Sequence, residues 1–332
     1  MSTNSSSHSS AARLLADVGG TNARFAWQAG RGAPIGDVQI LPCADYASIA
    51  DAIAAYLQRV GRSAPPACAI AIANPIVGDQ VKMTNHHWSF SISALKAHFG
   101  FELLRLLNDF TALALALPDL PPEDLRQVGG GAARPHAPIA LIGAGTGLGV
   151  SGLLPVNHAS GHGGWVPLEG EGGHITLAGC TPREQAVLDI IGARYGHMSA
   201  ERACCGQGLV DIHLALQQLD GIAPPAPLDA ASITAGALEH NEPRCSETID
   251  LFCAFLGTAA GNLALTLGSH GGVYIGGGIV PRLGARFDAS PFRERMENKG
   301  RFKDYLAAMP AFVILAKQSP ALYGAARAIE AF

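Results

Sequence analysis

The chain lacks the cysteine patterns that carry metal or redox chemistry. None of its seven cysteines belongs to a CxxC pair, and none has a histidine partner at the spacing of a zinc site. We therefore expect reduced thiols in a cytoplasmic protein. The chain also lacks the basic surface expected of a nucleic-acid-binding protein, because its net charge is −4 and no basic stripe is interleaved with aromatic residues. This argues against nucleic acid as a partner.

No segment suggests export or membrane insertion. The opening residues, MSTNSSSHSS, lack the basic and apolar regions of a secretory signal, and we expect a disordered tail over residues 1–11. The longest run without Asp, Glu, Lys or Arg, residues 135–168, is interrupted by Gly, Pro, His and Asn. We expect no transmembrane helix there and no membrane partner. The length of 332 residues fits about two domains.

What the chain does contain is a carboxylate at a predicted strand-to-helix corner. The apolar run over residues 103–107 leads into Asn108 and Asp109, and an Ala- and Leu-rich helix follows until Pro118. In open α/β sheets, ligands bind beyond the carboxyl ends of the strands, so Asp109 is a candidate general base. The alternative is that Asp109 only caps the helix by accepting backbone N–H bonds.

Residues 13–28, RLLADVGGTNARFAWQ, predict a strand, a tight glycine turn and a second strand. A Walker loop is excluded, because the segment has neither the lysine nor the following helix. Consecutive backbone N–H groups at a glycine turn can still bind phosphate, and Asp17 just before the turn could hold Mg²⁺. The alternative is an ordinary hairpin turn.

Residues 139–154, IALIGAGTGLGVSGLL, repeat this arrangement. Their GxGxxG-like spacing suggests a dinucleotide-dependent oxidoreductase, but that motif needs a helix directly after it, and LGVSGLL favours a strand. Gly145-Thr146 matches Gly20-Thr21 of the first hairpin. The sequence therefore predicts two related halves, each presenting a glycine hairpin to one nucleotide.

Three further segments supply polar or glycine-rich turns. Glu171 and His174 lie around two glycines in LEGEGGHI and could bind vicinal hydroxyls, although the segment by itself favours a turn histidine at His174. Asn85 or Trp88 in MTNHHWSFS could border a sugar site. Residues 271–283 predict a strand, a bare glycine turn that lets a base or ribose approach, and a helix.

Eight segments, in order and spacing, resemble the bacterial ATP-dependent glucokinase family: DVGGTNAR, MTNHHWSFS, LLNDFTALALALP, GAGTGLG, GEGGH, GHMSAER, GGGIVPR and KGRFKDY. The resemblance covers nearly the whole chain. It implies an α/β, two-domain hexokinase/actin-like (ribonuclease H-like) fold with a sugar and nucleotide cleft between the domains. The small domain would comprise residues 12–118 and 316–332, and the large domain residues 119–315.

The resemblance also implies residue roles. Asp109 matches the catalytic base, and the glucose ligands match Asn108, Asp109, Glu171, His174 and Glu201. The ATP-binding positions match Ala16, Asp17, Val18, Gly19, Gly20, Thr21, Asn22, Gly145, Thr146, Gly147, Gly277 and Gly278, and Asp17 would also hold Mg²⁺ through water. The implied activity is transfer of the γ-phosphoryl group of ATP to the 6-hydroxyl of D-glucose, the entry step of glycolysis, by a homodimer. The alternative is a non-catalytic sugar-sensing protein on the same fold; the intact base, both hairpins and the lack of a DNA-binding module argue against it.

Overall fold

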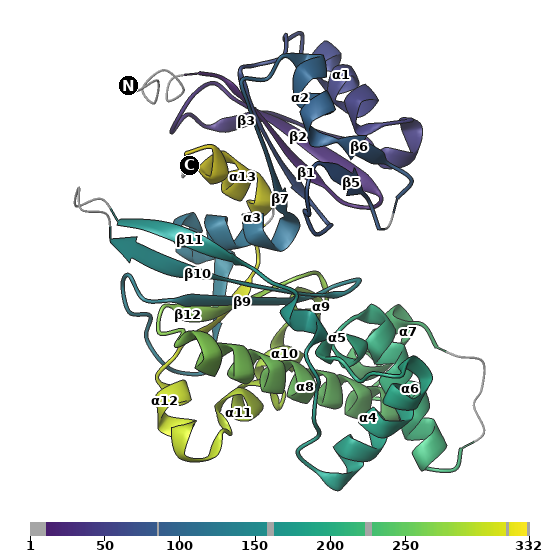
Figure 1. Ribbon diagram of the computed structural model, residues 1–332. Coiled ribbons are helices and arrows are strands. Elements are labelled where there is room, and N and C mark those ends of the chain that lie inside the picture. Colours follow the sequence, from purple (N-terminus) through teal and green to yellow (C-terminus); the bar gives the residue numbers. More distant parts are fainter. Residues whose placement is uncertain (1–10, 85, 158–162, 223–227, 317–318, 331–332) are drawn as a thin grey trace. The chain divides into compact units, whose positions relative to one another are not determined.

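The computed structural model describes residues 11–84, 86–157, 163–222, 228–316 and 319–330 (Figure 1). Most of the tail predicted over residues 1–11 therefore lies outside the described residues, as does Asn85. The chain forms two compact units. The first comprises Met1–Leu120, Val156–Glu169 and Ala316–Phe332, and the second comprises Pro121–Pro155 and Gly170–Leu315.

The first unit is built on a five-stranded sheet in the order β3-β2-β1-β4-β7. The strands are β1 (Arg13–Val18), β2 (Asn22–Gln28), β3 (Ile35–Pro42), β4 (Ala67–Ile72) and β7 (Leu103–Asn108), and β5 (Gln80–Lys82) pairs with β6 (Ser89–Ser91) in a separate ribbon. Strands β1 and β2 form the predicted antiparallel hairpin, and β1, β4 and β7 run parallel. Every side chain of β4 is buried, which is typical of a parallel strand covered on both faces.

Helices cover the two faces of this sheet. They are α1 (Ile49–Arg59), α2 (Ile92–Phe99), α3 (Asp109–Ala116) and α13 (Pro320–Glu330). One face packs with α1 around Phe25, Tyr56 and Trp88. Helix α13 packs against β1 and β4 through a second cluster that includes Leu322, and it also packs closely against α3 (Figure 1).

The second unit repeats the same plan. Its strands belong to a sheet of the order β11-β10-β9-β12-β13-β8, in which β11 and the last residues of β10 fall within the range Val156–Glu169 of the first unit. The strands are β8 (Leu125–Val128), β9 (Ile139–Ala144), β10 (Leu148–Asn157), β11 (Gly163–Glu169), β12 (Gly272–Gly276) and β13 (Ala311–Ile314). Strands β9 and β10 form an antiparallel hairpin, and β9, β12 and β13 run parallel. The predicted duplication of the glycine hairpin is confirmed, because each sheet places such a hairpin beside parallel strands. That both hairpins face one nucleotide stays a prediction.

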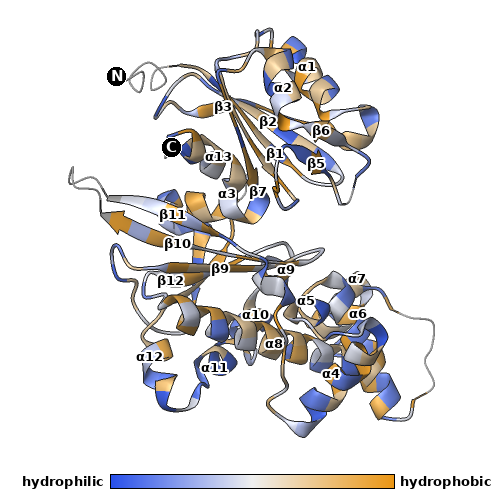
Figure 2. Ribbon diagram, viewed as in Figure 1, coloured by the Kyte–Doolittle hydropathy of each residue, from blue (hydrophilic) through white to orange (hydrophobic). Residues whose placement is uncertain are grey.

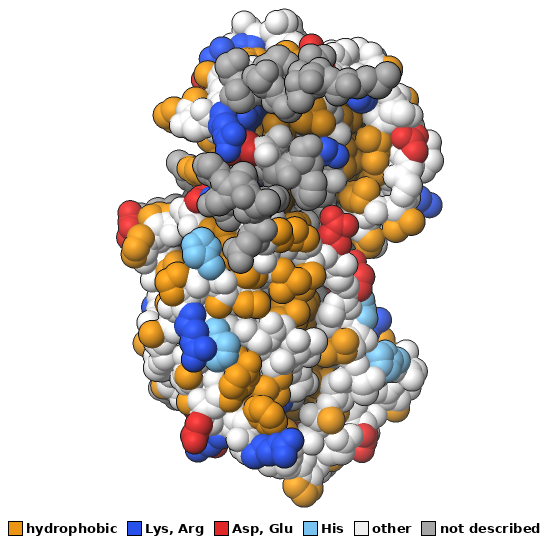
Figure 3. Space-filling model, turned by 60° about the vertical axis from the view of Figure 1, so that its left-hand side comes forward, with side chains coloured by type: hydrophobic (Ala, Val, Ile, Leu, Met, Phe, Trp, Pro, Cys, Tyr) orange, Lys and Arg blue, Asp and Glu red, His pale blue; other side chains and the backbone are white. Residues whose placement is uncertain are grey.

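The helices of the second unit are numerous and pack on its sheet and on one another. They are α4 (Pro182–Tyr195), α5 (Ala200–Ala203), α6 (Gly206–Leu219), α7 (Ala230–Leu238), α8 (Pro243–Leu267), α9 (Ile279–Leu283), α10 (Ala285–Asp288), α11 (Phe292–Glu297) and α12 (Lys303–Ala307). Figure 2 shows β9 mainly in hydrophobic colours. Figure 3 shows charged side chains of both signs scattered among hydrophobic and uncharged ones on one face.

Helix α8 is the central helix of the second unit. It is long and apolar enough to cross a membrane, but 72% of its most apolar window is buried inside the structure, which identifies a core helix. Gly257 and Gly261 let α11 approach it: a Cβ atom on either glycine would lie 2.3 Å from Phe292 O or 2.4 Å from Met296 O, respectively. The helix therefore packs closely against α11, and it extends from Pro243 to Leu267.

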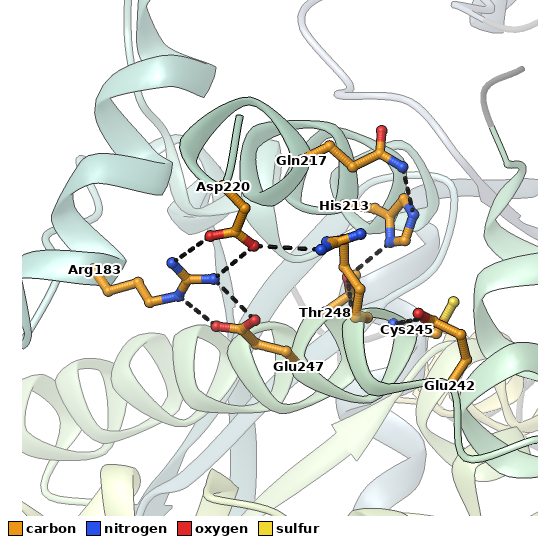
Figure 4. Close-up of polar contacts among 9 residues, drawn as sticks. Arg183, His213, Gln217, Asp220, Glu242, Cys245, Glu247 and Thr248 are labelled. Atoms are coloured by element: carbon orange, nitrogen blue, oxygen red, sulfur yellow. Dashed lines mark hydrogen bonds and ion pairs between the residues drawn. The ribbon is translucent and has the colours of Figure 1, made fainter. Parts of the chain in front are cut away.

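Polar side chains tie the beginning of α8 to α4 and α6 (Figure 4). Arg183 on α4 donates to Glu247 on α8, with Nε 2.5 Å from Oε1, and to Asp220 after α6, with Nη1 3.0 Å from Oδ1. The buried ring of His213 on α6 lies with Nδ1 3.1 Å from Thr248 Oγ1. Burial lowers the pKa of His213. Polar contacts therefore connect the three helices to one another.

Candidate active site

Strand β7 ends at Asn108 and helix α3 begins at Asp109, as predicted. Asn108 is the helix cap: its Oδ1 accepts hydrogen bonds from the backbone N–H groups of Phe110, at 2.9 Å, and Thr111, at 3.3 Å. Asp109 makes a further bond, since its Oδ1 accepts from Phe110 N at 2.9 Å. Capping is thus mainly the work of Asn108, and it leaves Asp109 Oδ2 outside the cap.

The environment of Asp109 makes it a stronger base than an ordinary aspartate. The residue is partly buried, and burial raises the pKa of Asp109 to about 6. The hydrogen bond from Phe110 N–H lowers this pKa, and the negative charge of Asp17 raises it. Near neutral pH the group is therefore mostly a carboxylate, with a pKa close to the working range of a general base.

The first hairpin lies in the same unit. Asp17 on β1 is directly opposite Arg24 on β2, and Arg24 Nη1 donates to Asp17 Oδ2 at 3.2 Å. Ser319 Oγ donates to the same oxygen at 2.6 Å. The turn between the strands is closed by a bond from Gly19 N to Asn22 O at 3.0 Å.

Within this hairpin, the residues predicted to bind ATP differ in how far their side chains are exposed. The side chains of Ala16 and Val18 are fully buried in the core, so only their backbone is available to a ligand. Gly20, Thr21 and Asn22 lie at the turn, where none of the three is fully buried. Trp88 is a core residue, 1% exposed, whose indole N–H donates to Tyr46 O at 3.0 Å, so it does not border a site.

In the second unit, the glycine hairpin joins β9 to β10 at Gly145, Thr146 and Gly147. Gly145 N donates to Gly147 O at 2.9 Å and closes the turn. Gly206, the first residue of α6, donates its N–H to Gly145 O at 2.9 Å. Because a strand and not a helix follows the turn, the dinucleotide interpretation is excluded.

The predicted sugar residues of the second unit come together. His174 lies between two carboxylates: its Nε2 is 3.9 Å from Glu171 Oε2, and its Nδ1 is 3.9 Å from Glu201 Oε1. Glu171 and His174 are exposed, with 62% and 58% of their side chains accessible. Glu201 is on the short helix α5, which backbone bonds connect to the glycine turn, among them Ala200 N to Ile175 O at 2.9 Å. Groups that are able to bind hydroxyls are thus close together.

A cavity of about 760 Å³ adjoins the second hairpin. Its lining residues come from the hairpin and from α6, α7 and α9: Gly145, Thr146, Gly206, Leu209, Ala230, Ala231, Thr234, Ala235, Leu238, Glu239, Gly278, Ile279 and Arg282. Its volume is within the range of small-molecule and cofactor sites. The walls supplied by α7, together with Glu239 and Arg282, were not predicted from the sequence.

The third glycine element contributes to this cavity through Gly278. Gly277 has a different task, because its φ is +81° and a Cβ atom there would lie 2.2 Å from Ala144 O. Only glycine fits this position, where the chain turns from β12 toward α9. The prediction of a strand, a glycine turn and a helix is confirmed.

A carboxylate of raised pKa at a strand end, duplicated glycine hairpins and a nucleotide-sized cavity define a sugar kinase of the actin-like class. The model of the family described as Glucokinase matches residues 14–331. A glucokinase from Aromatoleum aromaticum is 52% identical over 319 residues, covering 96% of this chain and 94% of the relative. One from Chromobacterium violaceum is 54% identical over 314 residues, covering 95% and 88%.

Solved structures agree. A glucokinase from an Antarctic psychrotroph superimposes with a TM-score of 0.86 at 36% identity, covering 96% of this chain and 98% of that one. A glucokinase from Balamuthia mandrillaris, solved with glucose, has a TM-score of 0.78 at 20% identity over 96% and 93% of the two chains, a likeness of fold. The chain therefore belongs to the glucokinase family and is an ATP-dependent glucose kinase. Nothing in these comparisons supports the non-catalytic sugar sensor.

Proposed function

We propose that Asp109 accepts the proton of the 6-hydroxyl of D-glucose while this oxygen attacks the γ-phosphorus of ATP, giving D-glucose 6-phosphate and ADP. The observation that supports this role best is the pKa of Asp109, about 6, at a strand-to-helix corner whose capping is done by Asn108. Such a group is ionised near neutral pH and is still basic enough to take a hydroxyl proton.

The remaining hydroxyls would be bound by Asn108, Glu171, His174 and Glu201. Asn108 uses its Oδ1 as the cap, so its Nδ2 group is the atom that can donate to the sugar. Glu171 and Glu201 can only accept, and the ring of His174 between them can do either. This mixture of donors and acceptors suits a polyol.

The two glycine hairpins would bind the phosphates of ATP through backbone N–H groups. Catalysis of phosphoryl transfer rests mainly on positioning and on stabilising negative charge, which such preorganised donors supply. The positions are Ala16 to Asn22 in the first hairpin and Gly145 to Gly147 in the second. The cavity beside Gly145 and Gly278 would take the nucleoside, since apolar walls and a few polar groups suit a base and ribose.

Magnesium would be held mainly by the phosphates and water. Among the described residues, no group of three or more His, Cys, Asp or Glu could hold a metal ion, so a cage made of protein ligands does not fit. A site made of one carboxylate and the substrate phosphates does fit the usual coordination of Mg²⁺ in proteins. Both described bonds to Asp17 use Oδ2, and we assign Oδ1 to the water shell of the ion. When bound, the ion neutralises phosphate charge.

The setting of the enzyme is proposed from the family resemblance: a cytoplasmic homodimer at the entry step of glycolysis. The seven free cysteines, six of them buried, suit a reducing compartment.

A coupled assay for glucose 6-phosphate, with Mg·ATP as the donor, tests the proposed function directly. We expect turnover that requires both glucose and the divalent ion. A purified, folded protein that binds glucose by calorimetry and forms no glucose 6-phosphate would contradict the proposal.

The pH profile should report the ionisation of Asp109. Because burial raises the pKa of Asp109 to about 6 and only the carboxylate accepts a proton, kcat/KM for glucose should fall as the pH decreases through about 6 and level off above about 7. The measurement is kcat/KM against pH, with circular dichroism confirming that the protein stays folded. A profile that stays flat through this interval would refute the assigned base.

A further inference from the structure

The backbone of one residue in the second unit, Leu148, meets the proposed sugar-binding residues through both its N–H group and its carbonyl oxygen. Leu148 is the first residue of β10, directly after the glycine hairpin. Its backbone N–H donates to Glu201 Oε2 at 3.0 Å. Its carbonyl oxygen lies against Gly173 of the sugar-binding turn, where a Cβ atom would approach to 2.2 Å. The hairpin and the sugar-binding residues therefore meet at Leu148.

The hairpin is shaped to admit the Glu201 carboxylate. A Cβ atom on Gly147 would lie 2.5 Å from Glu201 Oε2, closer than real Cβ contacts. The φ of Gly147 is not in the left-handed region, so its backbone conformation does not require glycine. What requires glycine at this position is the space that the carboxylate occupies.

The two oxygens of Glu201 have different neighbours. Oε2 accepts from Leu148 N–H, whereas Oε1 is directed to the sugar-binding group, 3.9 Å from His174 Nδ1. The Glu201 side chain is 27% exposed, so it is not fixed by packing alone. A hydroxyl donated to Oε1 would immobilise the carboxylate, and Oε2 would then hold Leu148 and the preceding hairpin in place.

We propose that Glu201, besides binding sugar, is a positioning residue for the phosphate-binding hairpin, and that it couples glucose binding to nucleotide binding. The inference rests on the proposed function, because it takes the sugar and phosphate roles of these segments as given. When a glucose hydroxyl binds Oε1, it orders the Glu201 carboxylate that anchors the hairpin. The nucleotide then loses less conformational entropy when it binds, because the hairpin is already ordered. The coupling is reciprocal, because each ligand must raise the affinity of the other by the same factor.

The test is the dissociation constant of the magnesium complex of AMPPNP, measured by calorimetry with and without saturating glucose. For the wild type we expect glucose to tighten binding about fivefold or more. Gly147→Ala should reduce this factor to about one, because its methyl group displaces the Glu201 carboxylate from Leu148, and a side-chain end can move without disturbing the backbone. Glu201→Ala should have the same effect.

The double variant separates positioning from direct steric hindrance. In the Glu201→Ala background, Gly147→Ala has no carboxylate to displace, so the coupling factor should stay at about one and any remaining change in AMPPNP affinity measures direct hindrance of the nucleotide by the methyl group. If the methyl group weakens AMPPNP equally in both backgrounds, it acts on the nucleotide itself and the inference is overturned. It is also overturned if Gly147→Ala keeps the wild-type factor, or if the wild type binds both ligands with no coupling.

Two controls complete the design. Gly130→Ala adds a methyl group in the same unit where a Cβ atom meets nothing within 4 Å, and it should keep the wild-type coupling factor and melting temperature. A titration of glucose alone into the wild type distinguishes failure of the proposed function from failure of the coupling role of Glu201. Absence of glucose binding would reject the proposed function, whereas glucose binding without coupling would reject only the role of Glu201.

Discussion

Asp109→Asn is expected to lower kcat by about 10² to 10⁴, the usual contribution of a general base, while glucose still binds. The amide keeps the size of the side chain and can still accept the Phe110 N–H bond, so α3 should begin at the same residue. It cannot accept a proton from the sugar. The measurement is kcat in the coupled assay together with the dissociation constant of glucose by calorimetry.

Stability supplies a second readout for this variant. The pKa of Asp109 is raised in the folded protein, so the folded state disfavours its ionised form, and stability contributed by this group falls as the pH rises through about 6. Replacing a partly buried carboxylate with a neutral amide should therefore leave the melting temperature at neutral pH unchanged or higher. Loss of activity with a lowered melting temperature would indicate damage to the fold instead.

Asp51→Asn is the matched control. Asp51 is an exposed residue on α1 of the same unit and lies outside the candidate site. It should retain wild-type kcat. If Asp109→Asn also retains it, the proton acceptor is another group and the proposed mechanism is wrong.

The parts of the fold that could be predicted from sequence are those with a local signal. Both glycine hairpins, the strand before Asp109 and the glycine turn at Gly277 follow from apolar runs interrupted by turn residues, and all are present. The identity of the cap was not predictable in this way. Asn108 and Asp109 are both good capping residues, and only the three-dimensional structure shows that Asn108 accepts two backbone bonds.

The nucleotide-sized cavity illustrates what sequence patterns could not supply. Its walls come from segments that are far apart in the chain. The glycine hairpin at Gly145 has a recognisable pattern, but the segments around Gly206 and Thr234 have an ordinary local sequence. The small residues of helix α7 give no sign in the sequence that they face a cavity. Likewise, the interrupted sequence before Pro42 hid strand β3, whose side chains are largely exposed. Long-range packing decides such features.

Gly324→Ala is expected to be the most disruptive single-methyl change in the first unit. A Cβ atom there would lie 1.6 Å from Ala112 O and 2.5 Å from its carbonyl carbon, closer than at any other described glycine. These are backbone atoms of α3, so no side chain can rotate away and α13 or α3 must shift. Overpacking of this kind typically lowers the free energy of unfolding by about 1 to 3 kcal/mol, and occasionally by more.

The same shift should reduce catalysis, because α3 begins at Asp109. A displacement of about 1 Å at a reacting group can lower the rate about 10²-fold, so kcat should fall even well below the melting temperature, where the variant is still folded. Gly36→Ala on β3 is the control, since a Cβ atom there meets nothing within 4 Å. It should match the wild type in melting temperature and in kcat.

A Gly324→Ala protein that melts and turns over like this control would show that α13 does not hold α3 in place. A lower melting temperature with unchanged kcat would show that α3 keeps its position and α13 alone moves.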